Sequence, residues 1–210
     1  PNYPGVFCIS TSYRNEPNPI PGRHEKIFPM FEFESKGNLD DLIKLESDLL
    51  VYLGLESPVV YDYEDLATKY DVSILETEHE EQMEKDIGKS VIIQHFPERT
   101  SPFWNMKHDK DGIFKKVDVI LYGQETIGSA ERATNKDEMR HFFETISEGG
   151  YKDKLYDLFG KDRVEEELKE YLSNDFYPRF GGGIGVTRLV RALKLKEDTP
   201  IGSNPIPTAI

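Results

Sequence analysis

The chain has 210 residues, of which 37% are hydrophobic and 31% charged, so it can build one large domain with a buried core, and wholesale disorder is not expected. Its 26 Lys and Arg residues against 39 Asp and Glu give a net charge of −13, which argues against a protein that grips nucleic acid mainly through phosphates. The single cysteine, Cys8, excludes an internal disulfide and a multi-cysteine zinc site, as is typical of a reducing cytoplasm. No run approaches membrane-spanning length, so no membrane partner is expected.

Two strand-like runs open the chain, at residues 6–14 and 27–34. The segment between them carries three prolines and a glycine, which predicts a hairpin with a long irregular loop. Asn38 can cap a helix that ends near Gly54. Because the first strand begins almost at once, we expect that an upstream segment precedes this sequence.

The remaining elements do not alternate regularly between strand and helix, so a parallel doubly wound sheet is not expected. We predict an α+β fold, in which an antiparallel sheet is flanked by helices. Residues 1–198 would form one domain and the proline-rich residues 199–210 a loop or tail. Strands are expected at 59–61, 91–95, 115–123 and 124–133, a broken strand pair at 97–106, helices at 64–70, 135–146, 152–159 and 162–176, and a solvated acidic helix face at 76–84.

The stretch FGGGIGVTRLVRAL, residues 180–193, joins three glycines to a helical pattern. Gly181–Gly183 allow close approach of a backbone or a ligand. Val186, Leu189, Val190 and Leu193 recur at helical spacing and would be buried, and Arg188 lies in the first turns, where an anion such as phosphate is favoured. The alternative is a Gly-rich turn before a core helix, with Arg188 reaching solvent. Neither a dinucleotide fingerprint nor a P-loop is present.

Asp118 is unusual because it lies in an apolar run, where an unpaired carboxylate is costly to bury. A Mg²⁺ ion shared with Glu125 would satisfy it, since Mg²⁺ typically takes one or two carboxylates plus phosphate oxygens. Strict strand alternation puts Glu125 and Arg132 on opposite faces, so both can serve one site only if the Gly128–Ser129 segment bulges.

Other charged and aromatic residues have simple structural explanations when taken singly. Arg14 and Glu16 could form a surface ion pair, Arg23 and His24 could be ordinary loop residues, and Phe28 could be a core residue. Taken together with Arg188 and the acid pair, these residues describe an ATP site without a P-loop. Such a site suits attack of a carboxylate on the α-phosphate, because positioning and electrostatic stabilisation do most of that work.

Three stretches resemble the class II aminoacyl-tRNA synthetases. TSYRNEPNPIPGRHEKIFPMFEFE resembles their motif 2, and FGGGIGVTRLVRAL resembles their motif 3. DVILYGQETIGSAERA is similar to the intervening strand pair of the aspartyl, asparaginyl and lysyl subgroup and of the related asparagine synthetases. The resemblance runs from about Tyr3 to Lys196 in the family's order, and motif 1 is not visible. It implies the family's catalytic domain, an antiparallel sheet flanked by helices.

The resemblance also implies roles for individual residues. Arg14 and Arg188 would be catalytic, holding the α- and γ-phosphates. Asp118 and Glu125 would bind Mg²⁺, and Arg132 would receive the α-carboxylate of the amino acid. The expected ATP-binding set is Arg14, Glu16, Arg23, His24, Phe28, Glu125, Gly185 and Arg188, with adenine between Phe28 and Arg188.

These observations predict an ATP-dependent ligase that forms an aminoacyl-adenylate, with ATP and Mg²⁺ as cofactors. The acceptor stays open between tRNA and ammonia, the latter giving an asparagine synthetase. The net charge of −13 does not support tRNA as the acceptor. A non-catalytic paralogue that binds nucleotide or amino acid is the other alternative. The resemblance implies a homodimer, and the amino acid cannot be named.

Overall fold

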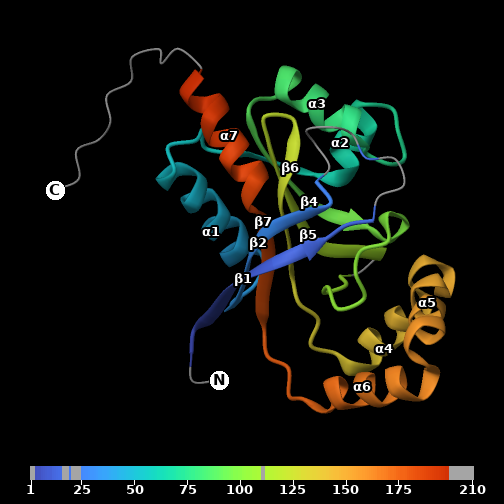
Figure 1. Cartoon of the computed structure of the whole chain (residues 1–210). Helices are drawn as coiled ribbons and strands as arrows, with labels where there is room; N and C mark the ends of the chain where they lie inside the picture. The colour runs from blue at the N-terminus through green and yellow to red at the C-terminus, as the bar shows by residue number, and fades with distance from the viewer. Residues whose placement is uncertain (1–2, 16–18, 20–24, 110–111, 199–210) are drawn as a thin grey trace.

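One sheet organises the computed structural model, which describes residues 3–15, 19, 25–109 and 112–198. Its seven strands in this part of the chain have the order β1-β2-β7-β6-β5-β4-β3 (Figure 1). Neighbouring strands are antiparallel except for the parallel pair β3–β4. The expected α+β class with an antiparallel sheet is therefore confirmed. The strands are β1 Gly5–Tyr13, β2 Ile27–Lys36, β3 Val59–Asp62, β4 Ser90–Pro97, β5 Ile113–Leu121, β6 Gln124–Glu131 and β7 Arg179–Gly185.

Helices α1 (Leu39–Tyr52) and α7 (Val186–Asp198) cover one face of the sheet (Figure 1). Asn38 caps α1 by accepting the Asp41 N–H, and the Asp41 carboxylate accepts the Asn38 N–H in return, which completes a capping box. The main core lies between these helices and the sheet. Its fully or nearly buried members include Leu39, Leu42, Leu50, Ile92, Val117, Val119, Leu121, Ile127, Phe180, Ile184 and Ala192.

Helices α2 (Tyr63–Lys69) and α3 (Thr77–Asp86) lie on the other face, over the β3–β4–β5 end of the sheet. Their core includes Leu66 and Met83, which pack against Ile93 of β4 and other strand residues. The rest of this face, over β6, β7, β2 and β1, holds the pocket described below. Alternation along each strand thus separates a helix-covered face from a ligand-accessible one.

Three further helices form a lobe at a distance from α1 and α7 (Figure 1). They are α4 Lys136–Thr145, α5 Gly150–Phe159 and α6 Lys161–Ser173, with the 3₁₀ turn η3 Ile146–Gly149 between the first two. Trp104 packs edge-on against Phe143 of α4 and Tyr171 of α6, which anchors the lobe to the loop after β4.

The expected strand pair at residues 97–106 is wrong. Pro97 ends β4, and the 3₁₀ turn η1 (Glu98–Thr100) follows at once. Ser101 has φ 50°, a left-handed conformation that interrupts an extended chain. Within the described residues, the later part of the segment makes only an isolated bridge between Met106 and Arg132. Its aromatic residues serve the helical lobe instead of a strand.

The structure bears on two other sequence expectations. The described helices include none that is both long and apolar enough to cross a lipid bilayer. Residues 199–210, expected to form a loop or tail, lie outside the described residues.

Glu46 of α1 is buried against β6, with 1% of its surface exposed. Its Oε1 accepts a hydrogen bond from Ser129 Oγ at 2.6 Å. Burial raises the pKa of Glu46 to about 8; the Ser129 hydrogen bond opposes this shift and the charge of Asp118 adds to it. The folded protein therefore binds this proton more tightly than the unfolded chain, whose reference pKa is 4.5. The stability from this group is complete below that reference value and is lost as pH rises through about 8.

Replacing Glu46 with glutamine is expected to remove this pH dependence. Relative to Glu46→Gln, the free energy of unfolding of the wild type should fall by on the order of 3 kcal/mol between about pH 5 and pH 9. Urea unfolding at a series of pH values measures the difference. Any contribution from other groups is shared by both proteins, so parallel pH profiles would rule out a titrating Glu46.

Candidate functional site

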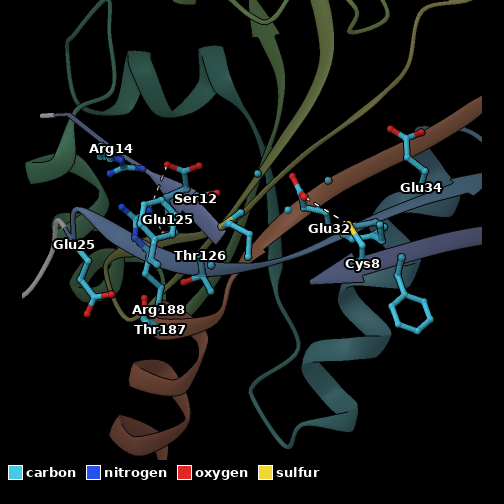
Figure 2. A pocket seen from close by; sticks show the side chains of 18 of the residues that line it. Cys8, Ser12, Arg14, Glu25, Glu32, Glu34, Glu125, Thr126, Thr187 and Arg188 are labelled. Carbon is cyan, nitrogen blue, oxygen red and sulfur yellow. Dashed lines mark hydrogen bonds and ion pairs between the residues drawn. The ribbon is translucent and has the colours of Figure 1, made fainter. Parts of the chain in front are cut away.

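A pocket of about 580 Å³ lies on the open face of the sheet, within the range typical of small-molecule sites. Figure 2 shows its two ends, one with Arg14, Glu125 and Arg188 and the other with Cys8 and Glu32. Six of the predicted site residues line it: Arg14, Phe28, Glu125, Arg132, Gly185 and Arg188. Asp118 lies beside it, whereas Glu16, Arg23 and His24 lie outside the described residues.

The floor of the pocket is strand β7, which contains Gly181–Gly183. The alternative of a Gly-rich turn is therefore wrong, because these glycines are paired in the middle of the sheet with β2 and β6. A Cβ on Gly182 would lie 2.8 Å from the Gly128 carbonyl oxygen, so close packing of backbones demands glycine there. A Cβ on Gly183 would meet mainly the end of the Met30 side chain, at 2.6 Å, and would narrow the pocket.

Arg188 lies in the first turns of α7, as the sequence predicted, and its guanidinium reaches the pocket. Its Nη1 donates a hydrogen bond of 2.7 Å to the Glu125 backbone carbonyl and lies 3.9 Å from Glu125 Oε2. Gly185 lies directly beneath, since a Cβ there would contact Arg188 Cδ at 3.5 Å. The helix buries Ala192 and partly buries Leu189 and Leu193. The expectation that Val190 is buried is wrong, because 43% of its surface is exposed.

Arg14 and Phe28 face each other across the hairpin of β1 and β2. The Arg14 guanidinium carbon lies 5.2 Å from the centre of the Phe28 ring, a cation–π contact. The Arg14 N–H donates to the Lys26 carbonyl at 2.8 Å, which continues the hairpin pairing by one residue beyond β1. A flat aromatic face beside two guanidinium groups suits a ligand that joins a base to phosphates.

A bulge in β6 brings Glu125 and Arg132 to the same face. The pairing of β5 with β6 shifts between Val119, which faces Ile127, and Ile120, which faces Glu125, so Thr126 is the extra residue. A Cβ on Gly128 would lie 3.1 Å from Glu125 Oε1, so both residues face the pocket. A bulge was expected, but its expected position at Gly128–Ser129 is wrong.

The carboxyl groups of Asp118 and Glu125 converge above Gly128. From the position that a Cβ on Gly128 would occupy, Asp118 Oδ1 is 3.7 Å away and Glu125 Oε1 is 3.1 Å away. Asp118 Oδ1 is buried and has no hydrogen-bond partner among the described residues. No group of three or more His, Cys, Asp or Glu side chains suited to a metal ion occurs in that part of the chain. Two carboxylates with a buried unpaired oxygen fit Mg²⁺ that is completed by phosphate and water oxygens.

Burial raises the pKa of Asp118 to about 7; the Lys116 ammonium opposes this shift, and the charges of Glu125 and Glu80 reinforce it. Lys116 forms an ion pair with Asp118 Oδ2. A strong pKa perturbation from burial and specific charges, next to a pocket, is typical of functional groups.

Arg132 is held in an ionic network at the far side of the floor. Its Nε donates to Glu34 Oε1 at 2.8 Å, and Arg179 Nε lies 3.4 Å from Glu34 Oε2. The side chains of both arginines are more than four-fifths buried, so the network fixes the Arg132 guanidinium at the pocket wall.

Three residues near the site were missed by the sequence interpretation. Glu80 Oε2 of α3 accepts the Glu125 N–H at 3.0 Å, but the acidic run that contains it gives no sign of this contact. Lys116 precedes Asp118 by two residues on the same face of β5, and strand alternation could have revealed the pair. Glu34 follows Glu32 by two residues in the strand sequence FEFE, so strand alternation could also have shown that both carboxylates lie on the same face of β2.

The family model described as tRNA synthetases class II (D, K and N) matches residues 3–198. This match covers almost the whole chain. The chain belongs to the class II tRNA synthetase family. No curated protein sequence matches it significantly.

Solved structures of class II tRNA synthetases share the fold. An asparaginyl-tRNA synthetase from Entamoeba histolytica, in complex with asparaginyl-adenylate, has a TM-score of 0.73 at 21% identity, over 92% of this chain and 50% of that one. One from Pyrococcus horikoshii, also with asparaginyl-adenylate, has 0.74 at 18% identity, over 97% and 54%. An Entamoeba histolytica aspartyl-tRNA synthetase has 0.68 at 18% identity, over 91% and 45%. The chain thus spans about half the length of these synthetases.

Proposed function

We propose that this member of the class II tRNA synthetase family activates an amino acid with ATP, forming an aminoacyl-adenylate and releasing pyrophosphate. One observation carries the proposal: Arg14 and Arg188 line one end of a glycine-floored pocket that also contains Glu125 and has Asp118 beside it. Two synthetases of the same fold are described with asparaginyl-adenylate, which supports this type of chemistry.

In the proposed reaction, a carboxylate oxygen of the amino acid attacks the α-phosphorus of ATP. The new P–O bond forms as the bond to pyrophosphate breaks, so no side-chain nucleophile is needed. The guanidinium groups of Arg14 and Arg188 would bind the phosphate oxygens and stabilise the negative charge that develops on them. Phe28 would offer a stacking face to the adenine. Mg²⁺, when held by Asp118 and Glu125, would neutralise phosphate charge.

Arg132 is the proposed contact for the α-carboxylate of the amino acid. Glu34 and Arg179 hold its guanidinium at the pocket wall before any substrate arrives, which reduces the entropy that binding would cost. The roles of Glu16, Arg23 and His24 in holding ATP rest on the resemblance alone, because these residues are outside the described part of the chain.

Amino-acid-dependent exchange of labelled pyrophosphate into ATP tests the proposed activation. We expect exchange with one member of a panel of the standard amino acids. ATP binding without exchange for any of them would favour the non-catalytic paralogue. The panel also names the amino acid, which the sequence leaves open.

The acceptor of the activated group is either tRNA or ammonia. The net charge of −13 favours a small acceptor, whereas the structural relatives described above are named as tRNA synthetases. If aspartate supports exchange, AMP release with aspartate and ammonia, compared with aspartate and bulk tRNA, separates the two.

A homodimer in the cytoplasm remains a prediction. The exposed apolar side chains of Phe7, Ile9 and Tyr13 on the edge strand β1 are consistent with a surface that a second subunit covers.

Asp118→Asn is expected to raise the Mg²⁺ concentration for half-maximal exchange by about tenfold or more, because a neutral amide is a weaker ligand than a carboxylate. A Mg²⁺ titration of the exchange rate measures this. Asp109→Asn is the control, since Asp109 is exposed and does not line the pocket. Identical titrations for Asp118→Asn and the wild type would remove Asp118 from the metal site.

A further inference from the structure

Lys116 places a positive charge beside the acid pair. It lies on β5 two residues before Asp118, so both side chains face the same side of the strand. Its ammonium pairs with Asp118 Oδ2 and lies 3.8 Å from the centre of the Phe96 ring. With 23% of the side chain exposed, the ammonium is held between a carboxylate and an aromatic face.

The ammonium leaves the metal-facing side of the acid pair open. Lys116 Nζ donates a hydrogen bond to Asp118 Oδ2, whereas Asp118 Oδ1 is the oxygen that faces Glu125 Oε1 above Gly128. A divalent ion and Lys116 can therefore contact opposite oxygens of one carboxylate at the same time. They would repel each other across it, because both are cations separated by little more than the carboxyl group.

The local charges are nearly balanced before any ligand binds. The carboxylates of Asp118 and Glu125 converge above Gly128, and the Glu80 carboxylate accepts the Glu125 N–H at 3.0 Å. Lys116 and Arg188 provide the cationic groups next to this cluster. Little net negative charge remains to attract a free divalent ion.

We propose that Lys116 is a built-in counter-ion of this acid pair, and that it keeps the affinity for a free divalent cation low until a triphosphate supplies further negative charge. The inference rests on the metal site of the proposed function. Its consequence is that the cation enters together with the nucleotide, so an ion alone does not occupy the pair.

Mn²⁺ binding in the absence of nucleotide tests this role without any measurement of activity. The concentration of free Mn²⁺ can be followed by electron paramagnetic resonance at one fixed pH for all variants. Lys116→Gln removes the charge but keeps a hydrogen-bond donor for Asp118. We expect it to bind Mn²⁺ about tenfold more tightly than the wild type.

Two variants serve as matched controls. Lys116→Arg keeps the charge, and Lys115→Gln removes the same charge from the neighbouring residue, whose Nζ lies 3.6 Å from Glu131 Oε2 and 3.8 Å from Asp109 Oδ2 instead. Both should bind Mn²⁺ within about twofold of the wild type. A non-hydrolysable ATP analogue should shrink the difference between Lys116→Gln and the wild type.

The outcomes separate this inference from the proposed function. If the wild type binds Mn²⁺ and Asp118→Asn does not, the metal site stands. If Lys116→Gln then binds Mn²⁺ no more tightly than the wild type, the counter-ion role is overturned. An absence of Mn²⁺ binding by the wild type even with the ATP analogue would overturn both the metal site and this inference. Tighter binding by Lys116→Arg as well would also contradict a role for charge.

Discussion

Arg188→Ala is expected to lower amino-acid-dependent pyrophosphate exchange by at least about a hundredfold, the size of effect that follows loss of a preorganised charge at a transition state. The guanidinium lines the same end of the pocket as Arg14 and is oriented by its 2.7 Å hydrogen bond to the Glu125 carbonyl (Figure 2). Alanine removes the charge and the donor but keeps the helix, since alanine is the best helix former. Exchange assays and ATP titrations measure the loss.

Arg191→Ala is the matched control for this prediction. Arg191 lies on the same helix and also donates to a backbone carbonyl, that of Tyr122 at 3.2 Å, but it does not line the pocket. Both variants lose a comparable structural contact, so their stabilities should be similar. Exchange by Arg188→Ala within about tenfold of that by Arg191→Ala would show that Arg188 is not a catalytic group.

The second large effect is expected from alanine substitutions of two neighbouring glycines in the pocket floor, one of which should lower ATP affinity and the other stability. Gly183→Ala is expected to fold with nearly wild-type stability and to lose at least about tenfold in ATP affinity, because its methyl displaces only the flexible end of Met30 and protrudes into the pocket. Gly182→Ala is expected to lose more than about 2 kcal/mol of stability, because its methyl would lie 2.4 Å from Ser129 Cβ and 2.8 Å from the Gly128 carbonyl oxygen.

Urea unfolding and ATP titration together test this pair of variants. Gly182→Ala should unfold at a clearly lower urea concentration, whereas Gly183→Ala should differ from the wild type mainly in the titration. Equal stabilities would show that the β6–β7 pairing can widen at Gly182. Unchanged ATP affinity of Gly183→Ala would show that the nucleotide does not lie over this part of the floor.

Features written in local sequence were predicted well. The cap at Asn38 and its apolar spacing identified α1, and the prolines between two aromatic-rich strands identified the β1–β2 hairpin. The glycine run before Arg188 identified the pocket floor and the helix that follows it. Six predicted residues line one pocket, and they lie on β2, β6, β7 and α7 or directly after β1 and β6.

Features that depend on register and tertiary contact could not be derived in this way. The need for a bulge follows from residue spacing, but its position at Thr126 is set by how β5 and β6 pair. The contact between Glu80 and the Glu125 backbone depends on where α3 docks on the β5–β6 hairpin, and an acidic helix face looks the same whether or not it docks. The segment after β4 was misassigned because its aromatic residues belong to the helical lobe.

The extra residue at Thr126 has a consequence for how this strand can change during evolution. A single-residue insertion or deletion between Glu125 and Arg132 that keeps the bulge would turn one of these two side chains from the pocket face of the sheet to the face that packs against the main core. Length changes here are therefore tolerable only in pairs, or when one of them abolishes the irregularity. An alignment gap of one residue that leaves the bulge in place would mark a relative in which the acid and the arginine lie on opposite faces of the sheet.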